Sequence, residues 1–123
     1  MKILAISNSF ESFINHRKKL INNLSTEHNL LVIGGEDNYI EDIEQLNINY
    51  KIINIKTTSK NLFYDIYLIY QIYKIFSQFK PELVLNFTIK PNIYGSLIAN
   101  IFNVPNINNV TGMGRGFLSG FLK

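Results

Sequence analysis

Apolar and polar residues follow one another along this chain in blocks whose period alternates between that of a strand and that of a helix. Short apolar runs, each of a length typical of a buried strand, cover residues 2–7, 30–33, 50–55, 83–86 and 105–110. Between them, apolar residues recur every three or four positions, which predicts helices over residues 14–28, 36–44, 63–79 and 93–102. Strands that alternate with helices through short links indicate right-handed crossovers. The pattern therefore predicts an α/β fold, a Rossmann-like parallel sheet of about five strands with helices on both faces.

Length and composition limit the chain to one domain of modest size. The 123 residues are 46% hydrophobic, which is enough for one core and short for two. We assign residues 1–116 to this domain and interpret residues 117–123 as an apolar tail, the start of a missing segment. The first apolar run is too short for a signal peptide, so a cytoplasmic location is the default expectation.

Residue types exclude several kinds of chemistry. The chain has no cysteine and only two histidines, His16 and His28, so disulfides, thiolate catalysis and a His-based metal site are not expected. We predict no metal and no cofactor. The first strand is not followed by the glycine pattern of a dinucleotide-binding loop, and neither a P-loop nor a nucleophile elbow occurs anywhere in the chain.

The charge distribution is more informative than the formal net charge of +3. Acidic residues crowd residues 36–44, whereas after Asp65 the only acid is Glu82. The basic residues do not form the dense stripe that nucleic-acid binding needs, so no nucleic acid is predicted as a partner. A basic and apolar C-terminal half suits an anionic substrate or an anionic lipid surface, and solvated charge explains it equally well.

The helix over residues 63–79 is unusual because a tyrosine recurs at every third position. These are Tyr64, Tyr67, Tyr70 and Tyr73. The run is too short for a membrane span and contains Asp65 and Lys74. We predict a heavily buried helix whose tyrosine hydroxyls lie at the domain edge. A stripe that faces a membrane or a partner protein is the alternative.

The junction between the fourth strand and the following helix is the first candidate site. Ligands of open α/β sheets bind beyond the carboxyl ends of the strands. Thr88, Lys90 and Asn92 follow the fourth strand directly, so we expect their side chains to point into a crevice. Pro91 suits the first position of the helix that begins there.

Two further loops follow the carboxyl ends of strands. Asn15, His16 and Arg17 stand at the start of the first helix, where backbone N–H groups favour an anion and Arg17 offers a bidentate phosphate contact. A solvated helix face explains Arg17 and the lysines after it equally well. The loop after the fifth strand carries Thr111, Gly112, Gly114 and Arg115. Its glycines would let the backbone approach a ligand, and a flexible connector is the alternative.

Several of these segments together resemble the N-terminal domain of bacterial family 4 glycosyltransferases. The segments are Asn15-His16-Arg17, Lys80-Pro81-Glu82-Leu83-Val84, Asn86 to Ser96 with its Lys-Pro-Asn-x-Tyr-Gly pattern, and Asn109 to Gly114 with its Thr-Gly-Met-Gly pattern. Within that family the chain is most similar to enzymes that build polysaccharides and glycans on polyprenyl-diphosphate carriers. The resemblance implies half of a GT-B fold, in which the N-terminal domain receives the acceptor and the C-terminal domain holds most of the nucleotide-sugar.

The resemblance also implies roles for individual residues. Arg17, Lys90 and Arg115 would face the phosphate or sugar of the acceptor, and Thr111, Gly112 and Gly114 would border the reaction centre. The other members of the predicted substrate-binding set are Asn15, His16, Thr88 and Asn92. Asn109 and Thr111 stand where several family members carry a histidine or an acid, so no catalytic base is assigned.

Two functional hypotheses follow. The first is the acceptor-binding half of a transferase that moves a sugar from a nucleotide-sugar to a lipid-linked or polysaccharide acceptor. These 123 residues lack the acidic donor-binding motif, so the chain alone is expected to be inactive and to need a donor-binding domain or subunit. Such an enzyme would contact the inner face of the cell membrane peripherally. The alternative is a non-catalytic α/β scaffold or binding module that acts through its apolar helix and tail.

Overall fold

The computed structural model describes residues 1–55 and 62–109, and within them the predicted α/β fold is confirmed. Five parallel strands form one sheet in the order β3-β2-β1-β4-β5. The strands are β1 (Lys2–Ser9), β2 (Asn29–Gly35), β3 (Asn49–Ile52), β4 (Leu83–Phe87) and β5 (Asn106–Asn109). The helices are α1 (Glu11–His16), α2 (Lys18–Glu27), α3 (Ile40–Gln45), α4 (Leu62–Phe79) and α5 (Ile89–Ile101).

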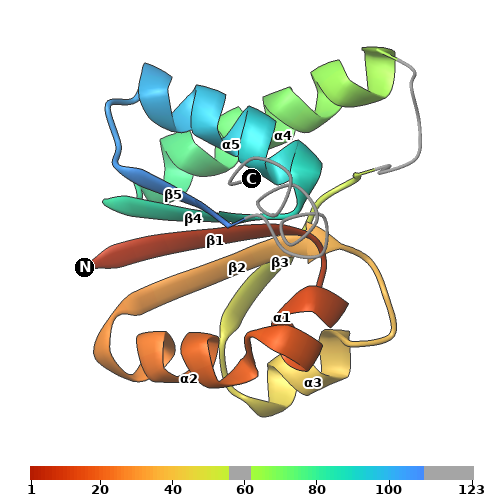
Figure 1. The fold of residues 1–123 in the computed structure, drawn as a ribbon, viewed down its shortest axis with the longest axis vertical. Coiled ribbons are helices and arrows are strands. Elements are labelled where there is room, and N and C mark those ends of the chain that lie inside the picture. Colours follow the sequence, from red (N-terminus) through yellow and green to blue (C-terminus); the bar gives the residue numbers. More distant parts are fainter. Residues whose placement is uncertain (56–61, 110–123) are drawn as a thin grey trace, which may run out of the picture.

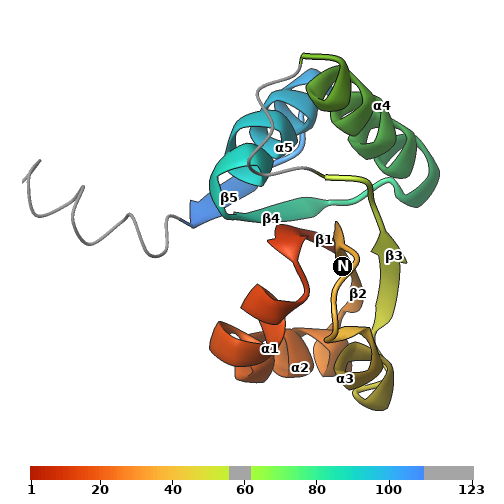
Figure 2. The ribbon, with the colours of Figure 1, turned by 90° about the vertical axis from the view of Figure 1, so that its right-hand side faces the viewer.

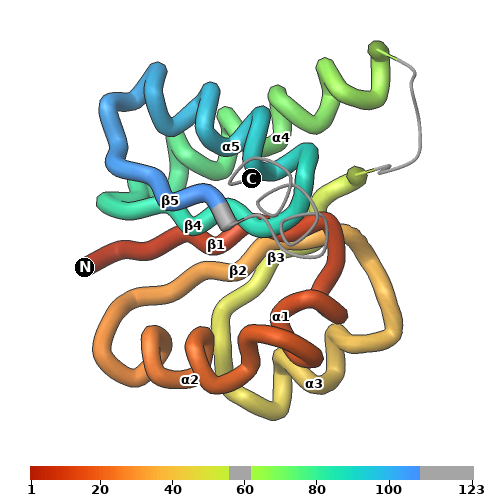
Figure 3. The backbone as a smooth tube through the Cα atoms, in the orientation of Figure 1, coloured from red at the N-terminus to blue at the C-terminus, as the bar shows by residue number. Residues whose placement is uncertain are grey.

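The helices form two layers, one on each face of the sheet. Helices α1, α2 and α3 cover one face, and α4 and α5 lie side by side on the other (Figures 1 and 2). The backbone starts at the central strand β1, moves outwards through β2 to β3, and then crosses back to β4 and β5 (Figure 3). The direction of the strand order therefore reverses between β1 and β4, which is where ligands of such sheets bind.

The core has two halves because side chains of a strand alternate between the faces of the sheet. In β1, Leu4 and Ile6 pack under α4 and α5, whereas Ile3 and Ala5 pack under α1, α2 and α3. All four are at most 1% exposed. The apolar run predicted for this strand is therefore a central strand buried on both faces, as the parallel sheet requires.

The first helical segment differs from the prediction. The chain forms two helices with Arg17 between them at φ −132° and ψ 13°, a backbone conformation outside the helical region. Helix α1 begins at Glu11, so the loop expected over residues 8–13 is shorter than predicted. The break lets Phe13 of α1 and Ile21 of α2 both enter the same half of the core.

The acidic segment, residues 36–44, is helical only from Ile40 onwards. The predicted start of this helix at residue 36 is therefore wrong. The carboxylate of Asp37 accepts hydrogen bonds from the backbone N–H groups of Tyr39 and Glu11, both at 2.9 Å. An aspartate that bonds nearby backbone in this way stabilises a turn at the expense of a helix. Asp37 thereby also attaches this turn to the start of α1.

The third strand ends earlier than predicted and the last helix begins earlier. Beyond Ile52 the backbone of Asn54 bonds to the side chain of Gln71 in α4, with N···O distances of 2.9 Å and 3.0 Å, instead of continuing as a strand. Helix α5 begins at Ile89, so Pro91 is its third residue and not its first. The position still suits proline, because the first N–H groups of a helix have no partner within the helix.

Helix α4 spans the predicted residues, but the expectation that it is heavily buried is wrong. Leu68, Ile72, Ile75 and Phe76 face the sheet, while the tyrosines at every third position lie 39–58% exposed. A sheet covers only one side of a helix, and no other described element covers the outer side. None of the helices in the described part of the chain is long and apolar enough to cross a membrane.

Candidate functional site

The candidate site lies at the carboxyl ends of β1 and β4, where the strand order reverses. Thr88 follows β4 directly, and its Oγ1 accepts a hydrogen bond from the backbone N–H of Asn8 near the end of β1, at 3.1 Å. This bond joins the first loop to the β4–α5 junction, two segments 80 residues apart in the sequence. The sequence predicts Thr88 at this edge of the sheet, and the structure shows that its side chain connects the two segments there.

Thr88 adopts a backbone conformation that few non-glycine residues tolerate. Its φ is 72° and its ψ is 171°, a region occupied mainly by glycine. It stands at the N-cap position of α5, yet its hydroxyl makes no capping bond and instead contacts Asn8 and the carbonyl of Phe87. Thr88 therefore acts as a clamp between two loops, and not as a helix cap.

Arg17 reaches the same edge from the break between α1 and α2. Its guanidinium lies over the ring of Phe87, the last residue of β4, with 5.4 Å between Cζ and the ring centroid. A cation over an aromatic face is held there by the ring quadrupole, which positions the charge beside the switch point. Its neighbours Asn15 and His16 are exposed on α1. Of the three predicted anion-binding residues, Arg17 is the one that a contact places against the β4–α5 junction.

Lys90 has a carboxylate partner that the sequence analysis did not anticipate. Its Nζ lies 2.7 Å from Oδ1 of Asp65 in α4, and the hydroxyl of Tyr94 donates to Oδ2 of the same carboxylate at 2.8 Å. The hydrogen bonds from Lys90 and then Tyr94 hold the pKa of Asp65 below its usual value. Asp65 in turn raises the pKa of Tyr94. Lys90 therefore joins α5 to α4, and the expectation that its side chain points into an open crevice is wrong, because its ammonium is paired with Asp65.

Asn86 and Gly95 determine how closely α5 approaches β4. Asn86 is fully buried, and its Nδ2 donates to Oδ1 of Asn108 in β5 at 2.9 Å. A Cβ on Gly95 would lie only 2.1 Å from Oδ1 of Asn86, so only glycine allows this packing. The backbone N–H of Asn92, which is half-buried, donates to the carbonyl of Thr88 at 3.1 Å in the first turn of α5.

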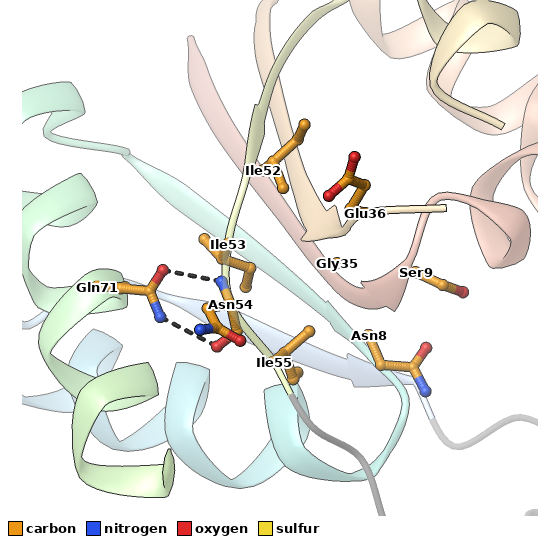
Figure 4. Close-up of a pocket in the computed structure, with 9 residues that line it drawn as sticks. All are labelled: Asn8, Ser9, Gly35, Glu36, Ile52, Ile53, Asn54, Ile55 and Gln71. Carbon is orange, nitrogen blue, oxygen red and sulfur yellow. Dashed lines mark hydrogen bonds between the residues drawn. The ribbon is translucent and has the colours of Figure 1, made fainter. Parts of the chain in front are cut away.

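A hollow of about 650 Å³ continues the same edge towards β3 (Figure 4). It is lined by Asn8, Ser9, Gly35, Glu36, Ile52, Ile53, Asn54, Ile55 and Gln71. No cation is among these residues, and Glu36 contributes a carboxylate. The hollow therefore suits uncharged polar groups, whereas the end of β4 with Arg17 suits an anion.

Gly35, at the end of β2, lines this hollow. A Cβ at this position would lie 2.7 Å from the carbonyl oxygen of Asn8 and 2.9 Å from Cγ2 of Ile55. The glycine thus allows the ends of β1, β2 and β3 to converge. Among the described residues, no group of three or more histidine, aspartate or glutamate side chains gathers in a way that could hold a metal ion.

The chain matches the family model described as "Glycosyl transferase 4-like" over residues 2–120. The chain belongs to the glycosyl transferase 4-like family. Family membership agrees with the resemblance found in the sequence. One of the segments that carry this resemblance, Asn86 to Ser96, forms the end of β4 and most of α5. No protein of curated function matches the chain in sequence.

Solved structures share the fold at low sequence identity. MurG of Acinetobacter baumannii superposes with a TM-score of 0.71 at 13% identity, over 89% of this chain and 33% of MurG. A glycosyltransferase of Rickettsia africae superposes with a TM-score of 0.69 at 16% identity, over 94% of this chain and 32% of that enzyme. SsfS6, a glycosyltransferase of a Streptomyces species, superposes with a TM-score of 0.65 at 18% identity, over 89% of this chain and 39% of SsfS6. The fold is thus one Rossmann-like half of the GT-B architecture, and the chain spans about a third of the length of MurG and of the Rickettsia enzyme.

The structure brings together only part of the substrate-binding set predicted for this family member. Arg17 and Thr88 lie at the β4–α5 junction through their contacts with Phe87 and Asn8, whereas Lys90 is paired with Asp65 of α4. Thr111, Gly112, Gly114 and Arg115 lie outside the described residues. Asp65 was not among the predicted site residues, although one signal was present, because it is the single acid in a helix made mostly of aromatic and aliphatic residues.

Proposed function

We propose that this chain is the acceptor-binding half of a sugar transferase. It would take a sugar from a nucleotide-sugar and pass it to a lipid-linked or polysaccharide acceptor, with the donor held by a further domain or subunit. Family membership supports a glycosyltransferase, and the fold is that of one GT-B half. The observation that carries the acceptor role is the position of Arg17 over Phe87, beside the Thr88–Asn8 clamp at the switch point.

In this proposal the residues at the sheet edge bind and orient the acceptor. Arg17 supplies positive charge near the end of β4, where a diphosphate would lie, and a guanidinium matches phosphate oxygens in pairs. The hollow near β3, which holds no cation, accommodates polar groups of the glycan. Three strand spacings separate β4 from β3, or about 14 Å, so an extended acceptor would run along the carboxyl edge of the sheet.

The first experiment measures binding of a soluble prenyl diphosphate, farnesyl diphosphate, to the chain by calorimetry. Arg17→Ala is expected to weaken binding about tenfold or more, because a charge-assisted contact is worth about 1.5–3 kcal/mol. Lys19→Ala is the matched control, since it removes the same charge from an exposed position on α2. Equal affinities of both variants and the unaltered chain would contradict a phosphate site at Arg17.

The second experiment supplies the donor-binding half. The chain is fused to, or mixed with, the C-terminal domain of a family enzyme, and transfer from a labelled nucleotide-sugar to a prenyl-diphosphate-linked glycan is measured. We expect the isolated chain to bind the nucleotide-sugar weakly and the combination to transfer sugar. Failure of every donor domain to restore transfer would count against the enzymatic role.

A non-catalytic binding module is the second candidate, because α4 and α5 expose many apolar side chains. Such a module would act through this surface and not through the edge of the sheet. Its partner binding would be lost with a change at Tyr67 or Tyr70 and would not respond to Arg17→Ala. The opposite pattern supports the acceptor role.

A further inference from the structure

Three hollows follow one another along the edge strand β3. The hollow of the candidate site, at the carboxyl end of β3, shares Ile52, Ile53 and Gln71 with a second hollow of about 310 Å³ between β3 and α4. The second hollow shares Lys51 and Gln78 with a third, of about 580 Å³, at the amino end of β3. The three hollows are therefore neighbours along one side of the sheet. We call the second and third together the β3 groove, which follows residues 49–53.

Lysines and tyrosines line the β3 groove, and no acid is among the described residues that line it. Lys51 of β3 and Lys74 of α4 supply two ammonium groups, while Tyr67 and Tyr70 supply two rings that are 49% and 58% exposed. The Nζ of Lys51 lies 3.5 Å from Oε1 of Gln78, so this ammonium is turned towards α4. The charge of the groove is thus opposite to that of the hollow at the carboxyl end, which holds a carboxylate and no cation.

These residue types match a sugar chain. A tyrosine offers an apolar ring to the C–H face of a sugar and a hydroxyl to its polar groups. The amides of Gln71 and Gln78 both donate and accept hydrogen bonds, as sugar hydroxyls do. Tyr67 and Tyr70 are about 4.5 Å apart along the helix axis, which is close to the length of one sugar unit. The two rings therefore suit two successive sugars.

The lysines and the length of the groove narrow the ligand further. Two ammonium groups without a carboxylate in the same groove are complementary to an anionic ligand. The three hollows together follow residues 49–54, about 16 Å of extended chain, which gives room for several sugar units. A polymer with negative charge uses both features, whereas a single small anion would use one lysine and one hollow.

An extended peptide that adds to the free edge of β3 is the competing ligand. Strand β3 has only four residues. Just beyond it, the backbone N–H and C=O of Asn54 are already bonded to Gln71 of α4 (Figure 4). Lys51 on the strand also opposes edge-to-edge pairing. The edge thus offers few backbone groups to a peptide, and the side chains of the groove favour a glycan.

We propose that the β3 groove binds a glycan strand that carries carboxylate groups, as a second site next to the candidate acceptor site. The inference rests on the proposed function, because a glycan is the polymer that such a transferase extends, and it adds the charge of that glycan. The groove holds the part of the strand that is distant from the reacting end. The hollow at the carboxyl end of β3 connects the two sites.

The test measures binding of oligosaccharides to the full chain by calorimetry. The acidic probes are oligomers of galacturonate, mannuronate and guluronate, and the neutral probe is a maltooligosaccharide of the same length. We expect at least one acidic oligomer to bind about tenfold more tightly than the neutral one. Tyr70→Ala should weaken this binding about tenfold, and Lys74→Gln about fivefold.

Each variant has a matched control. Tyr73→Ala changes a tyrosine of the same helix that is similarly exposed, at 48%, and does not line the groove. Lys19→Gln removes an exposed ammonium on α2, on the other face of the sheet. Both controls should bind as the unaltered chain does, and circular dichroism checks that every variant is folded. Added salt should narrow the difference between Lys74→Gln and the unaltered chain, because salt screens exposed charges.

Arg17→Ala separates the groove from the acceptor site. It should leave binding of the acidic oligomers unchanged, and Tyr70→Ala should leave binding of farnesyl diphosphate unchanged. Oligomer binding without diphosphate binding would contradict the phosphate site at Arg17 and support the groove. Diphosphate binding without oligomer binding would contradict the groove alone.

Three results would overturn the proposal. The first is that none of the acidic oligomers binds more tightly than the neutral one. The second is a Tyr70→Ala variant that binds the acidic oligomer as tightly as the unaltered chain, which would place the oligomer elsewhere. The third is polyglutamate that binds as tightly as the acidic oligomers and loses affinity with Lys74→Gln, which would make the edge of β3 a site for acidic peptides.

Discussion

Substituting Gly95 by alanine is the sharpest test of how the β4–α5 junction is built. An ideal Cβ at this position would lie 2.1 Å from Oδ1 and 2.9 Å from Cγ of Asn86, and 3.2 Å from Cδ1 of Ile6. These neighbours are fully buried. The close approach of helix to strand therefore depends on the missing side chain of Gly95.

The expected magnitude is a balance of opposed terms. Alanine is favoured over glycine inside a helix by about 1 kcal/mol. Against this, Asn86 must move, which breaks the 2.9 Å bond from its Nδ2 to Asn108 and costs about 1 kcal/mol. Overpacking a buried site costs a further amount of about 1–3 kcal/mol. The free energy of unfolding should therefore fall by about 1–3 kcal/mol in Gly95→Ala.

The assay is urea denaturation followed by far-UV circular dichroism, with thermal melting as a second measure. Ser96→Ala is the matched control, because Ser96 is the next residue of the same helix and lies partly exposed. It should change the free energy of unfolding by only about 0.5 kcal/mol. A difference between the two variants reports the contact with Asn86 and not helix propensity.

A double-mutant cycle identifies the cause of the loss. In an Asn86→Ala background the clash is absent, so Gly95→Ala should then be neutral or slightly stabilising. The reasoning is refuted if Gly95→Ala alone is as stable as the unaltered chain. It is also refuted if its cost is the same with and without Asn86.

Substitutions at two further residues, Asp65 and Thr88, test the surroundings of the junction. Asp65→Asn should lower stability near neutral pH, and because Lys90 and Tyr94 hold the pKa of Asp65 below its unfolded value of about 3.9, the difference from the unaltered chain should shrink as pH falls below about 4. Denaturation at several pH values checks this, and a difference independent of pH would contradict it. Thr88→Ala keeps a Cβ at φ 72° and loses the bond from Asn8, whereas Thr88→Gly loses the same bond but suits that backbone conformation. The glycine variant should be more stable than the alanine variant by about 1–2 kcal/mol, and the reverse order would refute strain at this residue.

Most of the fold was predictable because it depends on local patterns. Each strand of the sheet overlaps an apolar run, and each predicted helix overlaps at least one observed helix, since hydrophobic period depends on neighbouring residues alone. The position of Thr88 and Lys90 at a strand end followed from the same reasoning. Boundaries failed where a side chain competed for the backbone, as Asp37 does before α3 and Gln71 does after β3.

The candidate site was less predictable, because its contacts join distant parts of the chain. Lys90 was expected in an open crevice, and its pairing with Asp65 requires α4 and α5 to lie side by side. Arg17 was one of three successive basic residues, and only the break between α1 and α2 places it over Phe87. A local sequence pattern does not predict how far apart two residues from distant parts of the chain lie in the fold.

The sequence by itself determined the class of fold, the succession of strands and helices, and the family resemblance carried by the segment from Asn86 to Ser96. The tertiary structure decided which of the charged residues reach the switch point and which side of α4 is covered. The physical reason is that hydrophobic periodicity fixes which side of an element seeks burial, whereas the layers of the fold fix how much burial is available. Two helices share one face of this sheet, no other described element lies on them, and their outer sides stay exposed.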